Sequence, residues 1–93
     1  MFAWDPAKAA TNLAKHGVAF EDAALVFEDP FQRSRQDRHE GSEERWQTLG
    51  MVGGLALLVV AHTWQEADGS ELIRIISARR ATKQERREYE QQR

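Results

Sequence analysis

An unbroken apolar run from Leu55 to Ala61 is the feature that most restricts how this chain can fold. Because every residue of the run is hydrophobic, the pattern predicts a strand that is buried on both faces. We therefore expect residues 55–64 to form a central strand of a sheet. Gly53 and Gly54 come directly before it and predict a two-residue hairpin turn, since both turn residues need positive φ angles. The run is much shorter than the roughly 20 apolar residues of a membrane span.

Two helices are expected before the sheet. Asp5-Pro6 can start a helix, because the aspartate caps free amides and proline suits the first helical position. Gly17 can end it in a left-handed conformation. Apolar residues at helical spacing then predict a second helix over residues 20–27, which ends before Pro30.

The remaining strands are predicted from shorter patterns. Residues 45–52 and 72–78 are expected to be strands on either side of the central one, and 31–36 is a weaker strand candidate. Residues 37–44 are strongly polar and predict a loop. Consecutive strands joined by short turns favour an antiparallel meander of three or four strands.

The carboxy-terminal segment begins with a capping box, Thr82-Lys83-Gln84-Glu85, and predicts a helix to about residue 91. Tyr89 is its only large apolar side chain, so we expect little packing on the chain's own core. The predicted fold is a single α+β domain over residues 1–93, with two amino-terminal helices on one face of the sheet. The expected core includes Leu13, Phe20, Phe27, Leu57, Val59, Ile73 and Ile75.

Charge and composition narrow the function classes. The absence of cysteine excludes a disulfide scaffold, a thiolate nucleophile and a thiolate zinc site, and it fits a cytoplasmic protein. Residues 1–73 hold 6 Lys/Arg and 12 Asp/Glu, a balance of −6, whereas residues 74–93 hold 7 and 3, a balance of +4. A basic segment on an acidic body indicates a focused anion site. The acidic stretch with His39, Glu40, Glu43 and Glu44 has no metal-ligand spacing, so we expect no metal and no cofactor.

Three arginines near the end of the last strand are the main candidates for chemistry. Arg74 interrupts an apolar strand, and a charge there must reach water, a carboxylate or an anionic ligand. Arg79 and Arg80 precede the Thr82 cap, where guanidinium groups and helix amides together suit a phosphate. The alternative is that Arg74 pairs with a neighbouring carboxylate while Arg79 and Arg80 are only solvated.

Histidines and tryptophans provide weaker candidates. His16 can transfer protons near neutral pH, or it can simply bind the last carbonyls of its helix. His62 is expected to be a hydrogen-bonded core residue. Trp4, Trp46 and Trp64 are expected to lie mainly in the core, although exposed members could stack on bases.

Several separate motifs give the chain a specific resemblance. They are Phe2-Ala3-Trp4-Asp5 with Lys8 and Asn12, Lys15-His16-Gly17-Val18 with Phe20, Ala23 with Val26-Phe27, Asp29-Pro30, Glu44-Arg45, Gly50, Ile73 to Ala81, Glu85-Arg86 and Tyr89. On these residues the chain resembles the BrnT family of type II toxin–antitoxin toxins almost from end to end.

The resemblance implies a RelE-like fold and a metal-independent endoribonuclease that blocks translation. It also implies neutralisation by a BrnA-type ribbon-helix-helix antitoxin, in a complex expected to hold two copies of each chain and to repress its own operon. By motif, the catalytic positions are Arg74, Arg79 and Arg80. The resemblance does not identify a general base, and His16, Lys15 and Tyr89 are the candidates for proton transfer. Lys15, Lys83 and Arg86 are the expected RNA-binding residues. The competing hypothesis is a degenerate toxin that only assembles a repressor complex.

Overall fold

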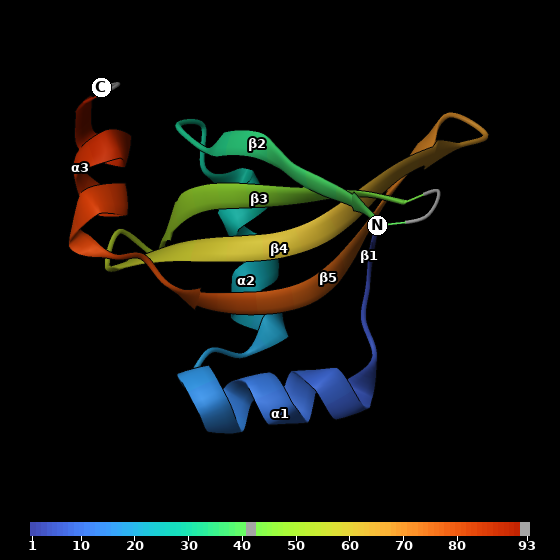
Figure 1. Cartoon of the computed structure of the whole chain (residues 1–93), viewed down its shortest axis with the longest axis horizontal. Coiled ribbons are helices and arrows are strands. Elements are labelled where there is room, and N and C mark those ends of the chain that lie inside the picture. The colour runs from blue at the N-terminus through green and yellow to red at the C-terminus, as the bar shows by residue number, and fades with distance from the viewer. Residues whose placement is uncertain (41–42, 92–93) are drawn as a thin grey trace.

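The computed structural model describes residues 1–40 and 43–91, with the side chains of 38–40, 43 and 67 left out of the description. The elements in chain order are β1 (Phe2–Ala3), α1 (Pro6–His16), α2 (Phe20–Ala24), the 3-10 helix η1 (Leu25–Glu28), β2 (Arg33–Glu40), β3 (Glu43–Val52), β4 (Ala56–Ala67), β5 (Ser70–Arg80) and α3 (Lys83–Gln91). One sheet has the order β1-β5-β4-β3-β2, so the predicted central position of the apolar strand is confirmed. Figure 1 shows α2 across one face of the sheet, α1 alongside β5 and α3 at one end.

The sheet differs from the prediction in size and in type. It has five strands among the described residues rather than three or four, and it is mixed, because β1 pairs parallel to β5 while the other pairs are antiparallel. The predicted loop over 37–44 was wrong: β2 extends to Glu40 and β3 begins at Glu43. Pairing between β2 and β3 satisfies the backbone hydrogen-bonding groups of this polar segment. A pattern of local polarity cannot predict such pairing, because it depends on a partner strand elsewhere in the chain. The Gly53-Gly54 turn is confirmed, with φ angles of 62° and 68°.

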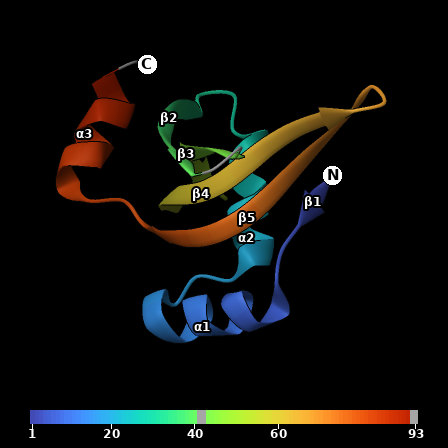
Figure 2. The same cartoon turned by 45° about the vertical axis from the view of Figure 1, so that its right-hand side comes forward.

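Helix α1 begins and ends as predicted, but it lies in an unexpected place. Asp5 Oδ1 accepts a hydrogen bond from the Ala7 amide, and Gly17 ends the helix at φ 70°. In both views of the ribbon the helix runs along the outer edge of β5 (Figures 1 and 2) rather than across the sheet. Its buried residue is the polar Asn12, whereas Leu13, a predicted core residue, is 52% exposed.

Asn12 explains how α1 is attached to the sheet edge. Its side-chain amide accepts a bond from the Ala78 amide at 3.0 Å and donates to the Ala78 carbonyl at 2.9 Å, as a neighbouring strand would. It also donates to the Val18 carbonyl at 2.9 Å, beyond the end of the helix. The carboxamide therefore covers an otherwise unpaired part of β5 and keeps that edge from pairing with another chain.

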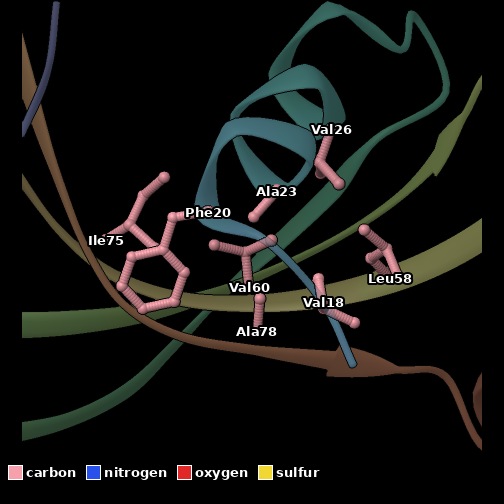
Figure 3. Packing of buried hydrophobic residues seen from close by; sticks show 8 residues of the cluster. All are labelled: Val18, Phe20, Ala23, Val26, Leu58, Val60, Ile75 and Ala78. Carbon is pink, nitrogen blue, oxygen red and sulfur yellow. The ribbon is translucent and has the colours of Figure 1, made fainter. Parts of the chain in front are cut away.

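The face of the sheet toward α2 carries the larger core, which we call the packed face. Its cluster consists of Val18, Phe20, Ala23, Val26, Leu58, Val60, Ile75 and Ala78 (Figure 3). Phe20, Ile73 and Ile75 are buried as predicted, and Phe27 packs against the cluster while only partly buried. Helix η1 reaches β3 closely: a Cβ at Gly50 would lie 2.7 Å from Val26 Cγ1, so only glycine fits there.

The opposite face has a small core of its own under α3. Leu57 and Val59 are buried as predicted, but on this side, where they pack with Leu49 and Tyr89. Tyr89 is only 1% exposed, so the expectation that α3 packs little on the chain itself was wrong. One aromatic side chain anchors the helix although the rest of it is polar.

Asp29 links the packed face to the opposite face of the sheet near the end of β3. Its Oδ2 accepts a hydrogen bond from the Tyr89 hydroxyl at 2.5 Å and from the Met51 amide at 2.7 Å. Its Oδ1 accepts from the Phe31 amide at 2.9 Å. This buried carboxylate therefore ties the end of η1, the strand β3 and the helix α3 together.

Candidate nucleic-acid interface

Arginines from three strands share the face opposite the packed face. Residues directly opposite each other in an antiparallel pair lie on the same face, as do alternate residues along one strand. Arg33 is opposite Leu49, Leu49 opposite Val59, and Val59 opposite Arg79, which places both arginines on the face that carries Tyr89. The same face carries two more sets of residues that lie opposite one another on neighbouring strands. In one set Arg35 is opposite Gln47. In the other, Arg45 is opposite Thr63, and Thr63 is opposite Arg74. We call these five residues, Arg33, Arg35, Arg45, Arg74 and Arg79, the arginine face.

A β-bulge brings the two arginines of β5 to the same side. Ser77 pairs with Ala61 and Ile75 pairs with His62, so Ile76 is an extra residue between them. Apart from Ile76, an odd number of residues lies between Arg74 and Arg79. The usual alternation of side chains along a strand therefore places both arginines on the arginine face. Without the bulge the two side chains would lie on opposite faces.

Arg79 is held at the start of α3 by a carboxylate. Its guanidinium donates to both oxygens of Glu85, at 2.8 and 2.9 Å, and Glu85 Oε1 also accepts from the Thr82 amide at 2.9 Å. The Glu85 amide in turn donates to the Thr82 hydroxyl, which confirms the predicted capping box. The hydrogen bonds from Arg79 lower the pKa of Glu85 to about 2, and the same bonds raise the pKa of Arg79.

Arg33, Arg35 and Arg74 have less charge compensation than Arg79. Arg35 donates to Gln47 Oε1 at 3.1 Å, and Arg33 donates to the Glu88 carbonyl at 3.5 Å. Arg33, Arg35 and Arg74 form no ion pair with any carboxylate in the described part of the chain. Arg74 is exposed and reaches solvent, and among the described residues it does not form the ion pair with a neighbouring acid that the sequence left open. A concentration of uncompensated guanidinium groups on an open surface attracts phosphates.

The three arginines singled out from the sequence do not meet at one point. Arg74 and Arg79 share the arginine face but are five positions apart on β5, with Ser77 between them on that face. Arg80 is opposite Leu58, a member of the packed-face cluster, so alternation assigns it to the other side. Lys83 and Arg86 are exposed on the first turns of α3, close in sequence to Arg79.

A second basic region lies at the outer edge of β5. Lys8, Lys15 and His16 from α1 line a surface hollow with Ile76 and Ser77 of the bulge. The structure therefore brings His16 and Lys15 next to the strand that carries Arg74 and Arg79. His16 lies in the last turn of α1 and is exposed, which leaves its ring open to solvent.

His62 is the buried core residue that was predicted. Its Nδ1 lies 3.1 Å from the Thr63 carbonyl and must donate to it, which leaves Nε2 to accept from the Thr48 hydroxyl at 2.7 Å. Thr48 then accepts from Ser34 at 2.7 Å. Burial lowers the pKa of His62, which suits a neutral ring with both nitrogens satisfied and no role in proton transfer.

The tryptophans lie on the packed-face side. Trp4 packs edge-on against Phe20 with ring centroids 6.0 Å apart, as expected for a core residue. Trp46 and Trp64 contact each other at 5.9 Å, and Trp64 also contacts His62. Trp64 is 37% exposed. A base stacked on Trp64 would therefore lie on the face away from the arginines.

Sequence reasoning missed Arg33, Arg35 and Arg45. Arg33 and Arg35 are two positions apart, the spacing that places side chains on one face of a strand, but they lie in a segment with only a weak strand prediction. Among the described residues no group of three His, Cys, Asp or Glu is placed to hold a metal ion, and the side chains of His39, Glu40 and Glu43 lie outside the description. None of the helices described is both long and apolar enough to cross a membrane.

Comparisons with known proteins place the chain among toxins. A family model described as "Ribonuclease toxin, BrnT, of type II toxin-antitoxin system" matches residues 4–85. The fold is similar to the 1.1 Å crystal structure of the Brucella abortus ribonuclease toxin BrnT, with a TM-score of 0.61 and 28% sequence identity. The match covers 89% of this chain and 99% of that one. No curated protein shows significant sequence similarity to the chain.

Proposed function

Because the chain belongs to the BrnT family of ribonuclease toxins of type II toxin–antitoxin systems, we propose that it cleaves RNA bound on the arginine face. The observation that supports this location is the alignment of five arginines from β2, β3 and β5 on an open face, three of them without an ion pair among the described residues. Guanidinium groups bind phosphates through paired, charge-assisted hydrogen bonds.

The proposed chemistry needs no metal ion. Cleavage of RNA by its own 2′-hydroxyl requires removal of a proton from that hydroxyl, stabilisation of the phosphorane charge and protonation of the leaving 5′-oxygen. Arg74 and Arg79 supply fixed positive charge for the second requirement. Arginine is too basic to remove a proton at neutral pH, so proton transfer is assigned to His16, which lies in the hollow beside β5.

Arg79 can reach a phosphate while it keeps its carboxylate partner. In the free protein its guanidinium is engaged by both oxygens of Glu85. A phosphate can share the remaining N–H groups, since a guanidinium has five donors. Arg80, at the end of β5 on the other side, is assigned to the flanking backbone, as are Lys15, Lys83 and Arg86.

The cellular role follows from membership of the family. We propose that cleavage blocks translation in the cytoplasm, and that a BrnA-type ribbon-helix-helix antitoxin neutralises the toxin in a complex with two copies of each chain that represses its own operon. The RelE-type relationship of the fold belongs to the same proposal. Size measurement of the co-expressed pair tests the complex: separate elution of the two chains at micromolar concentration would refute it.

The test of the enzymatic proposal compares single variants on single-stranded RNA in the presence of EDTA. We expect Arg74→Ala to reduce the cleavage rate by about 10²–10³-fold, the loss typical of one pre-organised transition-state donor. The melting temperature should stay unchanged, because Arg74 is exposed. Arg87→Ala is the matched control, since it removes an exposed arginine outside the arginine face.

Two results would contradict this proposal in different ways. Wild-type cleavage by Arg74→Ala, Arg79→Ala and Arg80→Ala alike would exclude the arginine mechanism, and loss of activity in EDTA would exclude metal independence. The alternative is a non-enzymatic toxin homologue, and the engagement of Arg79 by Glu85 is the observation that favours it. Growth arrest on induction without the neighbouring antitoxin gene would argue against that alternative.

A further inference from the structure

A hollow on the arginine face lies between α3 and the strands β2 and β3. Its floor is apolar, formed by Leu49 and Val59, and its walls include Arg33, Arg35, Gln47 and Glu88. It contains about 470 Å³ of empty space with its open mouth included. An apolar floor with a few polar groups around it suits a flat heteroaromatic ring better than it suits a phosphate.

The polar groups of this hollow have free hydrogen-bonding capacity. Gln47 Oε1 already accepts from Arg35, so the Nε2 amide of Gln47 remains as a donor. Glu88 is half-buried, and its carboxylate makes no hydrogen bond or ion pair with any residue in the described ranges. By contrast, the nearby carboxylate of Glu85 is used by Arg79 and Thr82. The hollow therefore offers the amide donor of Gln47 and the carboxylate acceptor of Glu88, besides the unused N–H groups of Arg33 and Arg35.

We propose that this hollow binds a guanine base of the RNA substrate, an inference that rests on the proposed function. The Watson–Crick edge of guanine presents two adjacent donors, N1–H and N2–H, beside the O6 acceptor. The Glu88 carboxylate accepts both N–H groups in two parallel hydrogen bonds, and Gln47 Nε2 donates to O6. The ring lies over Leu49 and Val59, and the guanidinium planes of Arg33 and Arg35 flank it or hold the adjacent phosphates.

The other bases match this arrangement less well. Uracil has a single ring N–H between two carbonyls, so one oxygen of the carboxylate would face a carbonyl. Adenine and cytosine each pair an exocyclic amino group with a ring nitrogen that only accepts, so a carboxylate would face a lone pair there. Leaving a desolvated polar group unpaired is costly, which makes such a site discriminate strongly. Guanine alone uses both carboxylate oxygens and the amide donor.

The test measures binding rather than cleavage. The probes are fluorescein-labelled, 2′-O-methylated oligouridines with one central guanine, adenine or inosine, which lack the nucleophile and cannot be cleaved by this route. We expect wild-type protein to bind the guanine probe about tenfold or more tightly than the adenine probe, as for a good bidentate base contact. Inosine lacks the N2 amino group and should fall between them.

Glu88→Gln should bring the ratio of the two dissociation constants close to one. The lost negative charge strengthens binding of both probes alike and cancels in this ratio. Glu90→Gln is the matched control, since Glu90 is an exposed residue of the same helix that does not line the hollow, and it should keep the wild-type ratio. Gln47→Leu removes the O6 donor at similar volume and should reduce the ratio as well.

Equal affinities of the wild-type protein for the three probes would overturn the guanine site, even if unmodified RNA is cleaved. A preference for guanine that survives Glu88→Gln would also overturn it. If the preference is found and is lost in Glu88→Gln while unmodified RNA is never cleaved, the base site stands and the ribonuclease proposal fails. The failures of the two proposals are therefore distinguishable.

Discussion

The packed face and the arginine face belong to the same strands but differ in how completely helices cover them. On the packed face, side chains of β4 and β5 meet those of α2 and η1, and residues such as Phe20 and Val60 have no exposed surface. On the arginine face, α3 covers only one end through Tyr89, and the rest of the face carries arginines among uncharged residues such as Ala61 and Thr63. The packed face thus supplies most of the buried apolar core. On the arginine face, the partial cover by α3 leaves a charged surface and, beside it, a hollow with an apolar floor. The two faces should therefore respond differently to mutation, pH and salt.

The largest expected difference is in the response to truncation of the core. Leu58→Ala removes a packed-face side chain that is only 3% exposed, and we expect it to lower the free energy of unfolding by about 2–5 kcal/mol. Leu55→Ala makes the same chemical change at a position that is 89% exposed, and should change it by less than about 0.5 kcal/mol. Urea titration measures both. Equal effects of the two variants would show that the packed face is not the main source of stability.

The next effect concerns the link between the faces. Tyr89→Phe removes the hydroxyl that donates to buried Asp29 and leaves the ring in place. We expect a loss of about 1.5–3 kcal/mol, because the bond reaches a charged, buried acceptor. Chemical denaturation measures the loss, and hydrogen exchange of the α3 amides should increase along with it. A variant as stable as the wild type would mean that α3 docks through the ring alone.

Acid should weaken the two faces in separate pH ranges. Burial lowers the pKa of His62 below its ordinary 6.5, so its contribution to stability is complete above pH 6.5 and decreases as the unfolded chain takes up a proton below it. The pKa of Glu85 is lowered from 4.5 to about 2, so its contribution is complete above about pH 4.5 and is lost as the pH falls toward 2. Both groups therefore make the protein less stable in acid.

Melting temperatures between pH 8 and pH 2 test this separation. His62→Asn should remove much of the decrease just below pH 6.5, at the cost of lower stability at neutral pH. Glu85→Gln should weaken the decrease below pH 4.5 and, through its damaged cap and ion pair, cost roughly 0.5–2 kcal/mol at pH 7. Retention of the complete wild-type pH profile by either variant would contradict its assignment.

The smallest expected effect is on the salt dependence of RNA binding. Each phosphate contact to a single strand contributes about 0.7 to the slope of log Kd against log salt concentration. Arg35→Ala should reduce that slope by about this amount and leave stability unchanged, whereas the Arg87→Ala control should leave the slope near the wild-type value. Anisotropy titrations at several salt concentrations measure it. A slope unaffected by Arg35→Ala would place the RNA elsewhere.

Local sequence was sufficient for features that depend on neighbouring residues. Asp5-Pro6 and Gly17 bound α1, Gly53-Gly54 makes the hairpin turn, and Thr82 with Glu85 forms the cap of α3. The apolar run of β4 also predicted its central place, because a strand without a polar face can only be stable when both faces are covered. The basic character of the last strand and helix was equally visible, since charge is a property of composition.

Tertiary structure decided everything that depends on pairing between distant segments. The strand β2 exists because residues 33–40 pair with β3, and this pairing places Arg33 and Arg35 beside Gln47 and Glu88. The bulge at Ile76 sets which side of the sheet Arg79 occupies, and so places it on the same face as Arg74.

Asn12 and Asp29 show the same dependence. Each is a short polar residue whose pattern indicates no more than a helix or a turn, yet each closes an edge of the sheet through hydrogen bonds to residues far away in sequence. Local propensity is set by a residue and its neighbours, and these residues were therefore predictable where they cap helices and form turns. Register and burial are set by contacts between distant residues, so the arginine face, its hollow and the two closed edges emerge only when the whole sheet is assembled.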